Sequence, residues 1–440
     1  KRGIIMKKKI NLSIFTKLSA IGVIVILLLI GLSCIKGKTR EREHSFDYAS
    51  YSINEAAGGS TTIKGFYIDV PYKETDSVEK WSNNQKHYET VITHGSVKLE
   101  PEELAVSGNI KTDVRKVGIY SSPVYTGKVK INSTFDMNLK DYGIREYEFD
   151  KAKIYLMIGE ENLTARPIFS VNKQKFRPDY TTYEDYPAIV KTGLPSKTGP
   201  LEISTELDIC GANIFQVSPA KGSTKMDITC DWPSPNFTNS SRLPVTREIT
   251  DDGFTASWFV PFTKGADTAS NSSYIGFQYK EPVSLYDILV RSTTYGFLFI
   301  IVPFLAFFLF EIFAKVNFHP VHYLLSGAAC AVFFLLLLSF SEHINFNTAY
   351  IIAAGLVGLL VSIYTGLISK KLKLGFAMLP ILVTLYSFLF VSLKSEDYAL
   401  LLGSIFVFMI MAILMFFTHK VDWNTIGKSK EEVKSFNKQS

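Results

Sequence analysis

Apolar residues along this chain are gathered into six runs, and each run is long enough to cross a lipid bilayer as a helix. The first run covers residues 18–35, and the other five cover residues 295–313, 322–340, 349–368, 374–393 and 398–418. A transmembrane helix needs roughly 20 apolar residues, because each residue rises about 1.5 Å and the hydrocarbon core is about 30 Å thick. The pattern therefore predicts an α-helical polytopic membrane protein with about six transmembrane helices in a lipid bilayer.

The polar segment between the first two runs is long enough for one sizeable domain. We therefore predict five parts: a basic cytoplasmic N-terminus (1–17), a transmembrane anchor (18–35), a β-rich domain outside the cytoplasm (36–290), a five-helix transmembrane bundle (291–418) and a basic cytoplasmic tail (419–440). The first run also has the basic start of a signal peptide. It is longer than a usual signal core and has no A-x-A cleavage site, which favours an uncleaved anchor.

Positive charges in the short loops predict the orientation, because cytoplasmic loops are enriched in Lys and Arg. If the C-terminus is cytoplasmic, the inner loops hold Lys315, Lys370, Lys371 and Lys373, and the tail adds further lysines. The outer loops then hold only Lys394. This asymmetry places both termini in the cytoplasm and the large polar domain outside it.

Alternating apolar and polar residues predict β-strands in the large domain. A stretch before them, residues 39–56, has few helix breakers and predicts a membrane-proximal helix that ends at Gly58 and Gly59. Four apolar faces follow: Val129, Ile131, Phe135, Met137 and Leu139; Leu201, Ile203, Thr205, Leu207 and Ile209; Met226, Ile228, Cys230 and Trp232; and Phe254, Ala256, Trp258 and Val260. Each suits an antiparallel strand with one face in a core, so we expect an all-β, sandwich-like domain.

Cys210 and Cys230 are a candidate disulfide, because they flank a predicted turn near Lys221 in an oxidising compartment. The strand phase argues against the bond. Cys210 falls on the polar face of its predicted strand, whereas Cys230 falls on the apolar face of its own strand, together with Trp232. Opposite faces of strands are bridged only across a bulge, for which Gly211 is one candidate position. The sequence leaves both states open.

Composition and the absence of known motifs exclude several classes of protein. With 47% hydrophobic and 20% charged residues, the chain is too apolar for a disordered protein or an ordinary soluble enzyme. Four cysteines are too few for a disulfide-stapled scaffold, and a net charge of +6 is small for a nucleic-acid-binding protein of this length. The sequence contains no hydrolase, zinc-protease, Walker, kinase or dinucleotide-binding motif. We therefore expect no catalytic, cofactor-binding or metal-binding residues, no cofactor and no nucleic-acid partner.

Polar residues at the ends of the predicted spans are the candidate functional residues of the membrane half. Glu311, His319 and His322 lie at the cytoplasmic end of the second and third spans, and Glu342 and His343 lie at the outer end of the third span. An ionisable residue within a span suggests function. Their positions near the interface favour structural roles instead, and we expect Glu311 to pair with Lys315 four residues on.

Several longer segments resemble the inner membrane protein CreD family. In the membrane half these are "FFLFEIFAKVNFHPVHYLLSG" (307–327), "LLLLSFSEHINF" (335–346), "YALLLGS" (398–404) and "VDW" (421–423). In the large domain they are "RKVGIYSSPVYTGKVKINSTFD" (115–136), "DWPSPNF" (231–237) and "REITDDGFTASW" (247–258). His322 stands where the family often has Gln. The resemblance implies the same layout, an N-terminal anchor, a periplasmic domain and five further spans in a bacterial inner membrane.

The resemblance also implies a role in cell-envelope integrity under stress, with no established enzymatic activity or cofactor. We therefore expect a non-enzymatic protein whose periplasmic domain binds an envelope protein or a peptidoglycan-related partner. One alternative is a small transporter or channel with a path near Glu311, His319 and His322. Another is a membrane sensor that acts through a separate cytoplasmic partner.

Overall fold

The structure, a computed structural model, describes residues 14–82, 85–137, 139, 146–183, 186–194, 199–238, 242–261, 274–279, 285–395 and 399–419. The chain forms two compact units. One is the β-rich unit Phe46–Pro282, and the other combines Lys1–Ser45 with Val283–Ser440. Helix α1 (Ile14–Ala56) contributes residues to both units, so the predicted anchor and the predicted membrane-proximal helix are parts of one helix.

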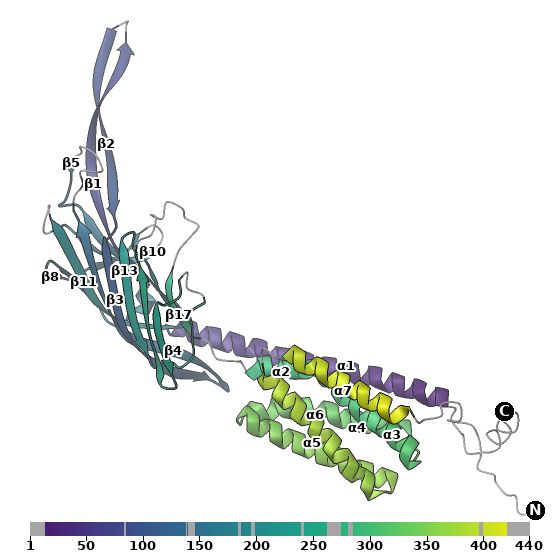
Figure 1. The fold of residues 1–440 in the computed structure, drawn as a ribbon. Helices are drawn as coiled ribbons and strands as arrows, with labels where there is room; N and C mark the ends of the chain where they lie inside the picture. The colour runs from purple at the N-terminus through teal and green to yellow at the C-terminus, as the bar shows by residue number, and fades with distance from the viewer. Residues whose placement is uncertain are drawn as a thin grey trace, which may run out of the picture. The chain divides into compact units, whose positions relative to one another are not determined.

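The β-rich unit contains two sheets among its described residues, drawn in Figure 1. Sheet A has the order β14 (Pro235–Asn236), β17 (Ile275–Tyr279), β12 (Ile214–Ser218), β1 (Thr61–Ser82), β6 (Lys153–Met157), β10 (Tyr186–Thr192) and β9 (Asp179–Tyr183), with β2 (Gln85–Leu99) and β5 (Glu146–Tyr147) also paired to β1. Sheet B has the order β15 (Thr246–Thr250), β16 (Gly253–Val260), β13 (Ser223–Cys230), β3 (Glu103–Val117), β4 (Tyr120–Asp136), β11 (Pro200–Ala212), β7 (Ile168–Val171) and β8 (Gln174–Phe176).

The inner faces of both sheets share one hydrophobic core, as expected for a sandwich. Phe66 of sheet A and Phe169 of sheet B meet edge to face with ring centroids 5.1 Å apart. The four predicted apolar faces all point inward, and only Trp232 is partly exposed. Most of the strand pairs are antiparallel, as the four faces suggest, but β1 pairs with β12, and β3 with β13, in parallel. The strands of each parallel pair are far apart in the sequence, so a hairpin does not join them.

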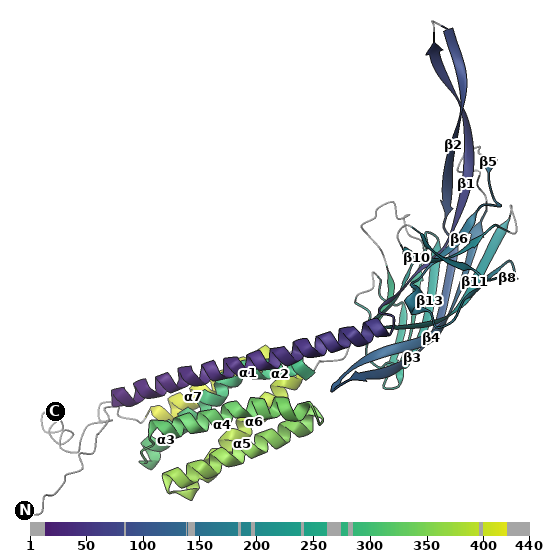
Figure 2. The ribbon, with the colours of Figure 1, turned by 180° about the vertical axis from the view of Figure 1, so that it is seen from behind.

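Strands β1 and β2 continue beyond the sandwich as a two-stranded ribbon. The pairing of β1 with β5 ends at Lys73, whereas its pairing with β2 runs on to Ser82 opposite Gln85. Figures 1 and 2 show this ribbon projecting from the sheets of its own unit.

The C-terminal end of α1 is fixed to the sandwich by hydrogen bonds. The buried Asn162 side chain, in the short 3-10 helix Glu160–Asn162, donates to the carbonyl oxygens of Gly58 (2.7 Å) and Cys210 (3.3 Å). Gly58 has a φ of +98°, and a Cβ atom there would lie 2.5 Å from the Glu161 carbonyl oxygen. Glycine is therefore required at the helix end, as predicted from the pair of glycines.

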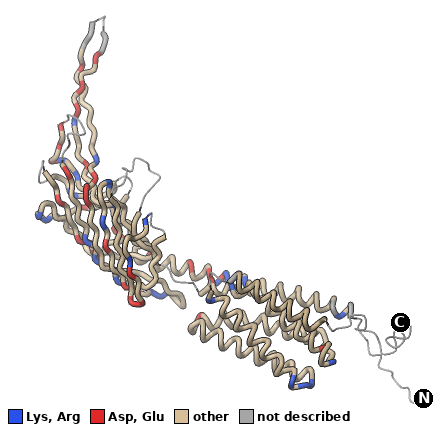
Figure 3. The backbone as a smooth tube through the Cα atoms, viewed as in Figure 1, with Lys and Arg blue, Asp and Glu red and all other residues tan. Residues whose placement is uncertain are grey.

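The second unit is a helical bundle. After α1 it contains α2 (Leu285–Thr294), α3 (Gly296–Ala314), α4 (Pro320–Ser341), α5 (Phe346–Ser369), α6 (Leu372–Lys394) and α7 (Ala399–Thr418). Among the described residues, six helices are long and apolar enough to cross a membrane, with α2 and α3 forming one such segment. This confirms the predicted number of spans. Charged residues are sparse along the bundle helices and gather near their ends (Figure 3).

Helix α1 packs into the bundle through two leucines. Leu28 and Leu32 are buried, whereas Ile26 and Ile30 on another face are exposed, as a lipid-facing residue would be. A side chain at Gly327 of α4 would overlap Leu28, and a Cβ atom at Gly296 of α3 would lie 3.0 Å from Leu32. Small residues thus let α1 approach the other helices closely, which is typical of packing within membranes.

Candidate functional site

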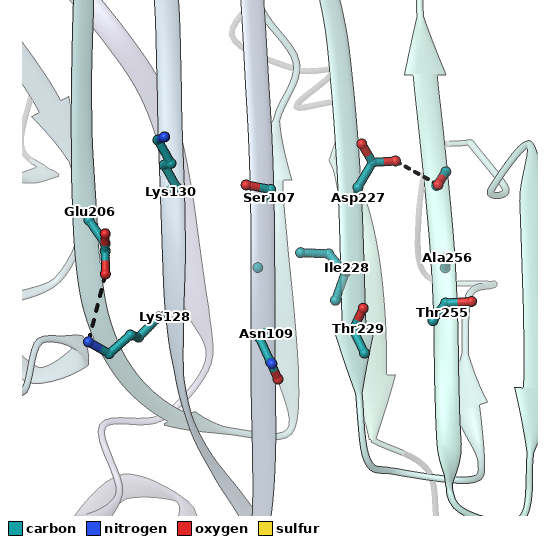
Figure 4. A pocket seen from close by; sticks show the side chains of 12 residues that line it. Ser107, Asn109, Lys128, Lys130, Glu206, Asp227, Ile228, Thr229, Thr255 and Ala256 are labelled. Atoms are coloured by element: carbon teal, nitrogen blue, oxygen red, sulfur yellow. Dashed lines mark hydrogen bonds and ion pairs between the residues drawn. The ribbon is translucent and has the colours of Figure 1, made fainter.

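A polar hollow of about 430 Å³ lies on the outer face of sheet B (Figure 4). Its lining comes from β3, β4, β11, β13 and β16 and comprises Ser107, Gly108, Asn109, Lys128, Lys130, Glu206, Asp227, Ile228, Thr229, Thr255, Ala256 and Ser257. Among the solvent-facing side chains of this set are hydroxyl, amide and charged groups. The hollow is thus a candidate binding surface for a polar ligand.

The strand register explains the floor of the hollow. Leu104, Val106 and Ile110 of β3 point into the core, so Ser107 and Asn109 between them point outward. Ser107 pairs in register with Lys130 of β4. Short side chains on the central strand, with longer ones on its neighbours, leave the surface hollowed over β3.

Charged residues of both signs lie on each side of β3. On the β4 side, Lys128 lies 3.7 Å from Glu206 and 3.6 Å from Asp208. On the β13 side, the Asp227 carboxylate accepts a 2.6 Å hydrogen bond from Ser257 and lies 3.2 Å from the Lys225 ammonium group. Within the described residues Lys130 forms no ion pair, so its ammonium group is available to a ligand.

A second hollow of about 300 Å³ adjoins the first and shares Asn109, Thr229 and Thr255 with it. It adds Lys111 of β3 and three acidic residues from the β13, β15 and β16 side, Asp231, Glu248 and Asp252. One oxygen of the Asp231 carboxylate is already engaged, because it accepts a 2.7 Å hydrogen bond from the Thr112 backbone N–H. The negative side of the surface therefore extends beyond Asp227. Sequence patterns missed both hollows, because no motif marks them.

Glu311 of α3 forms an ion pair with Lys17 of α1, not with Lys315 as expected. Its Oε1 also accepts a 2.7 Å hydrogen bond from the Phe318 backbone N–H, and Lys17 donates to the Asn317 side chain (3.1 Å). Lys315 ends α3 in a left-handed conformation, with a φ of 50°. The carboxylate thus joins α1 to the turn between α3 and α4.

The two histidines of this turn have separate partners. His319 caps the N-terminus of α4, where its Nδ1 accepts a 3.3 Å hydrogen bond from the Val321 backbone N–H. Nδ1 of His322 lies 2.8 Å from the hydroxyl oxygen of Tyr364 on α5. The structure therefore brings Glu311, His319 and His322 to one end of the bundle. Their described contacts either cap a helix or join two helices.

Glu342 ends α4 at the opposite side of the bundle. Its carboxylate lies 3.6 Å from Nε of Arg42 on α1 and accepts a 3.3 Å hydrogen bond from the hydroxyl group of Tyr286 on α2. The neighbouring His343 is exposed. Helix α4 has 22 residues, or about 33 Å at about 1.5 Å per residue, so Glu311 and Glu342 belong to separate sites.

Both cysteines of the candidate disulfide are free thiols in the structure. The Cys210 thiol donates to the Glu161 carbonyl oxygen at 3.2 Å. The buried Cys230 sulfur lies 3.3 Å from the Tyr279 hydroxyl oxygen. Burial raises the pKa of both thiols and of the Tyr279 hydroxyl group, so none of the three is activated as a nucleophile.

No group of three or more His, Cys, Asp or Glu side chains within the described ranges is arranged to hold a metal ion.

In the bundle, an apolar groove of about 560 Å³ lies between α5 and α6. Tyr350, Gly355, Gly358, Val383 and Tyr386 are among its lining residues. Ile351 and Val391 on its rims are exposed, as expected for side chains that face lipid.

Comparison with known proteins identifies the family to which this chain belongs. The sequence profile described as "Inner membrane protein CreD" matches residues 13–424. The protein "Inner membrane protein CreD" of Escherichia coli (strain K12) is 28% identical over 437 residues, which cover 95% of each chain. Among solved structures, an M1 zinc metallopeptidase from Deinococcus radiodurans aligns over 37% of this chain and 38% of its own, at 13% identity and a TM-score of 0.20. On the family match over nearly its whole length, this chain belongs to the CreD family and is a multi-pass inner membrane protein.

Proposed function

We propose that this protein supports the integrity of the cell envelope without acting as an enzyme, by binding an envelope component with its β-sandwich domain on the periplasmic side. The observation that carries the proposal is the polar hollow on sheet B, which offers hydroxyl and amide groups and the Lys130 ammonium group outside the hydrophobic core. Family membership supports the location in the inner membrane. The lysines of the short loops support an orientation with both termini in the cytoplasm.

The contacts of the membrane-end residues support a structural role for them over a transport path. Glu311 is engaged by Lys17 and by the Phe318 N–H group, and Glu342 by Arg42 and Tyr286. A proton or substrate path needs polar groups that continue through the membrane. These residues instead form two separate groups at the ends of the helices.

Complementation of a strain that lacks the protein tests the proposed function. We expect the strain to be more sensitive to detergent and to cell-wall antibiotics, and the intact protein to restore resistance. Ser107→Trp places a large ring in the hollow and should fail to restore it. Thr181→Trp, at an exposed position of β9 in the other sheet, is the matched control and should restore it. A strain without any envelope defect, or equal rescue by both variants, would contradict the proposal.

Single-cysteine labelling tests the orientation separately. Ser107→Cys and Lys373→Cys are placed in chains whose four native cysteines are replaced, and intact cells are exposed to a maleimide that cannot cross the inner membrane. We expect the cysteine at position 107 to be labelled in intact cells and that at position 373 only after lysis. The reverse result would place the β-rich domain in the cytoplasm.

A further inference from the structure

We infer that the hollow over β3 binds a short peptide that carries both a free ammonium group and a free carboxylate group. This inference rests on the proposed function and names the class of ligand that the same site would take. Its basis is the arrangement of charges across the strands, seen in Figure 4.

The two charged sides of the hollow are separated by one strand. Ser107 pairs in register with Lys130 on one neighbour and with Asp227 on the other. Neighbouring strands are about 4.8 Å apart, so the backbones carrying Lys130 and Asp227 are about 10 Å apart. An extended chain spans about 3.3–3.6 Å per residue, so a peptide of about three residues matches this separation.

The balance of charge favours a ligand with both signs over a polyanion. The lining holds Lys128 and Lys130 of β4, Glu206 of β11 and Asp227 of β13, so its formal charges cancel. A surface for polyanions would carry an excess of positive charge. Here the lysine without an ion pair among the described residues, Lys130, is on the β4 side. The acidic residues of the adjoining hollow add negative charge on the β13 side. A carboxylate would therefore lie toward Lys130. An ammonium group would lie toward Asp227 and the acidic residues beyond it, where it would compete with Lys225 for the Asp227 carboxylate.

The uncharged groups of the hollow suit the backbone of such a ligand. Ser107 and Asn109 of β3 present a hydroxyl and an amide group between the two charged sides, and Thr229 of β13 and Thr255 of β16 add hydroxyl groups beside Asp227. Hydroxyl and amide side chains both donate and accept hydrogen bonds, as peptide N–H and C=O groups require. The lining contains no aromatic side chain that could stack on a sugar ring.

Ligand-observed NMR titration of the full-length protein in detergent tests the inference. The probe is trialanine with free ends, and its control is trialanine with an acetylated N-terminus and an amidated C-terminus. We expect the free peptide to bind more tightly, by up to about 25-fold, since capping removes two charges and each exposed ion pair contributes up to about five-fold. Added salt should weaken its binding, because exposed charges are screened.

Paired variants locate the binding. Lys130→Met and Asp227→Asn should each weaken binding of free trialanine by up to about five-fold. Lys175→Met on β8 and Asp179→Asn on β9 change the same charges at exposed positions outside the hollow and should leave binding unchanged. Equal binding of the capped peptide, no effect of the two hollow variants, or displacement of the probe by an uncharged disaccharide alone would overturn the inference.

The outcomes also separate this inference from the proposed function. If trialanine fails to bind while Ser107→Trp still fails to complement, the hollow is functional and the ligand class is wrong. If trialanine binds as expected in a protein whose loss causes no envelope defect, the proposed function is wrong and the binding site remains.

Discussion

Arg42 of α1 reaches Glu342 at the end of α4, with 3.6 Å between Nε and the carboxylate oxygen. Lys17, 25 residues earlier on the same helix, pairs with Glu311 at the end of α3. Because α-helical residues rise about 1.5 Å each, the two basic residues are about 37 Å apart, slightly more than the hydrocarbon core is thick. The two ion pairs therefore join α1 to the bundle at the two boundaries of the membrane.

A double-mutant cycle measures the outer pair. The Glu342 side chain is only 9% exposed and Arg42 is 46% exposed, so we expect Arg42→Gln and Glu342→Gln to show a coupling free energy of about 0.5–1 kcal/mol. The readout is unfolding of the protein in mixed micelles with increasing dodecyl sulfate. Additive effects of the two substitutions would mean that the contact contributes no stability.

The inner pair distinguishes a structural role from transport. Glu311→Gln keeps an acceptor for the Phe318 N–H group, and His319→Asn keeps a side chain that can cap α4. We therefore expect the double variant to restore envelope resistance in the complementation assay. A folded double variant that restores nothing would favour the transporter or channel alternative.

The contact between α5 and α6 depends on the lack of a side chain at Gly375. A Cβ atom there would lie 2.7 Å from the Ser362 carbonyl oxygen and 3.1 Å from Gly366 Cα. Gly375→Val should therefore separate the helices and cost about 1–3 kcal/mol of the free energy of unfolding. The matched control is Gly355→Val on α5, since a Cβ atom at Gly355 has no neighbour within 4 Å. Equal stability of both variants in mixed micelles would contradict this contact.

Acidification should weaken the attachment of the β1–β2 ribbon. The Lys151 and Lys73 ammonium groups, each 3.0 Å from the Glu148 carboxylate, hold the pKa of Glu148 below its ordinary value of 4.5. Stability from a carboxyl group with a lowered pKa is present above the ordinary value and is lost as the pH falls through the lowered one.

We therefore expect proteolysis near Lys73 to accelerate below about pH 4.5 in the intact protein. Glu148→Gln should remove most of this acceleration, because the amide has no charge to lose. Glu102→Gln changes an exposed carboxylate before β3 and serves as the control. An unchanged pH profile in Glu148→Gln would show that other groups are responsible.

The cysteine arrangement predicts an unbridged protein. Since Cys210 and Cys230 contact different groups, we expect the denatured, unreduced protein to take up one maleimide at each of its four cysteines, as read by intact mass. Uptake at only two, rising to three in Cys210→Ser through release of Cys230, would instead demonstrate a disulfide.

The helices and strands of this protein follow from local patterns in its sequence. Runs such as 349–368 indicated spans because crossing the bilayer requires a fixed length of apolar helix. Alternation in β4 and β11 revealed which side chains are buried, since neighbouring residues of a strand point to opposite faces. Both signals are local, so they can be read without knowing which elements pack together.

The contacts between distant elements do not follow from the sequence pattern and are seen in the tertiary structure alone. Glu311 was expected to pair with Lys315 because the two are one helical turn apart, yet its partner Lys17 is 294 residues away. The hollow over Ser107 depends likewise on which strands lie beside β3, and β13 pairs with it in parallel from more than 100 residues away. Such partners are selected by packing of the whole core and bundle, which a local pattern does not encode.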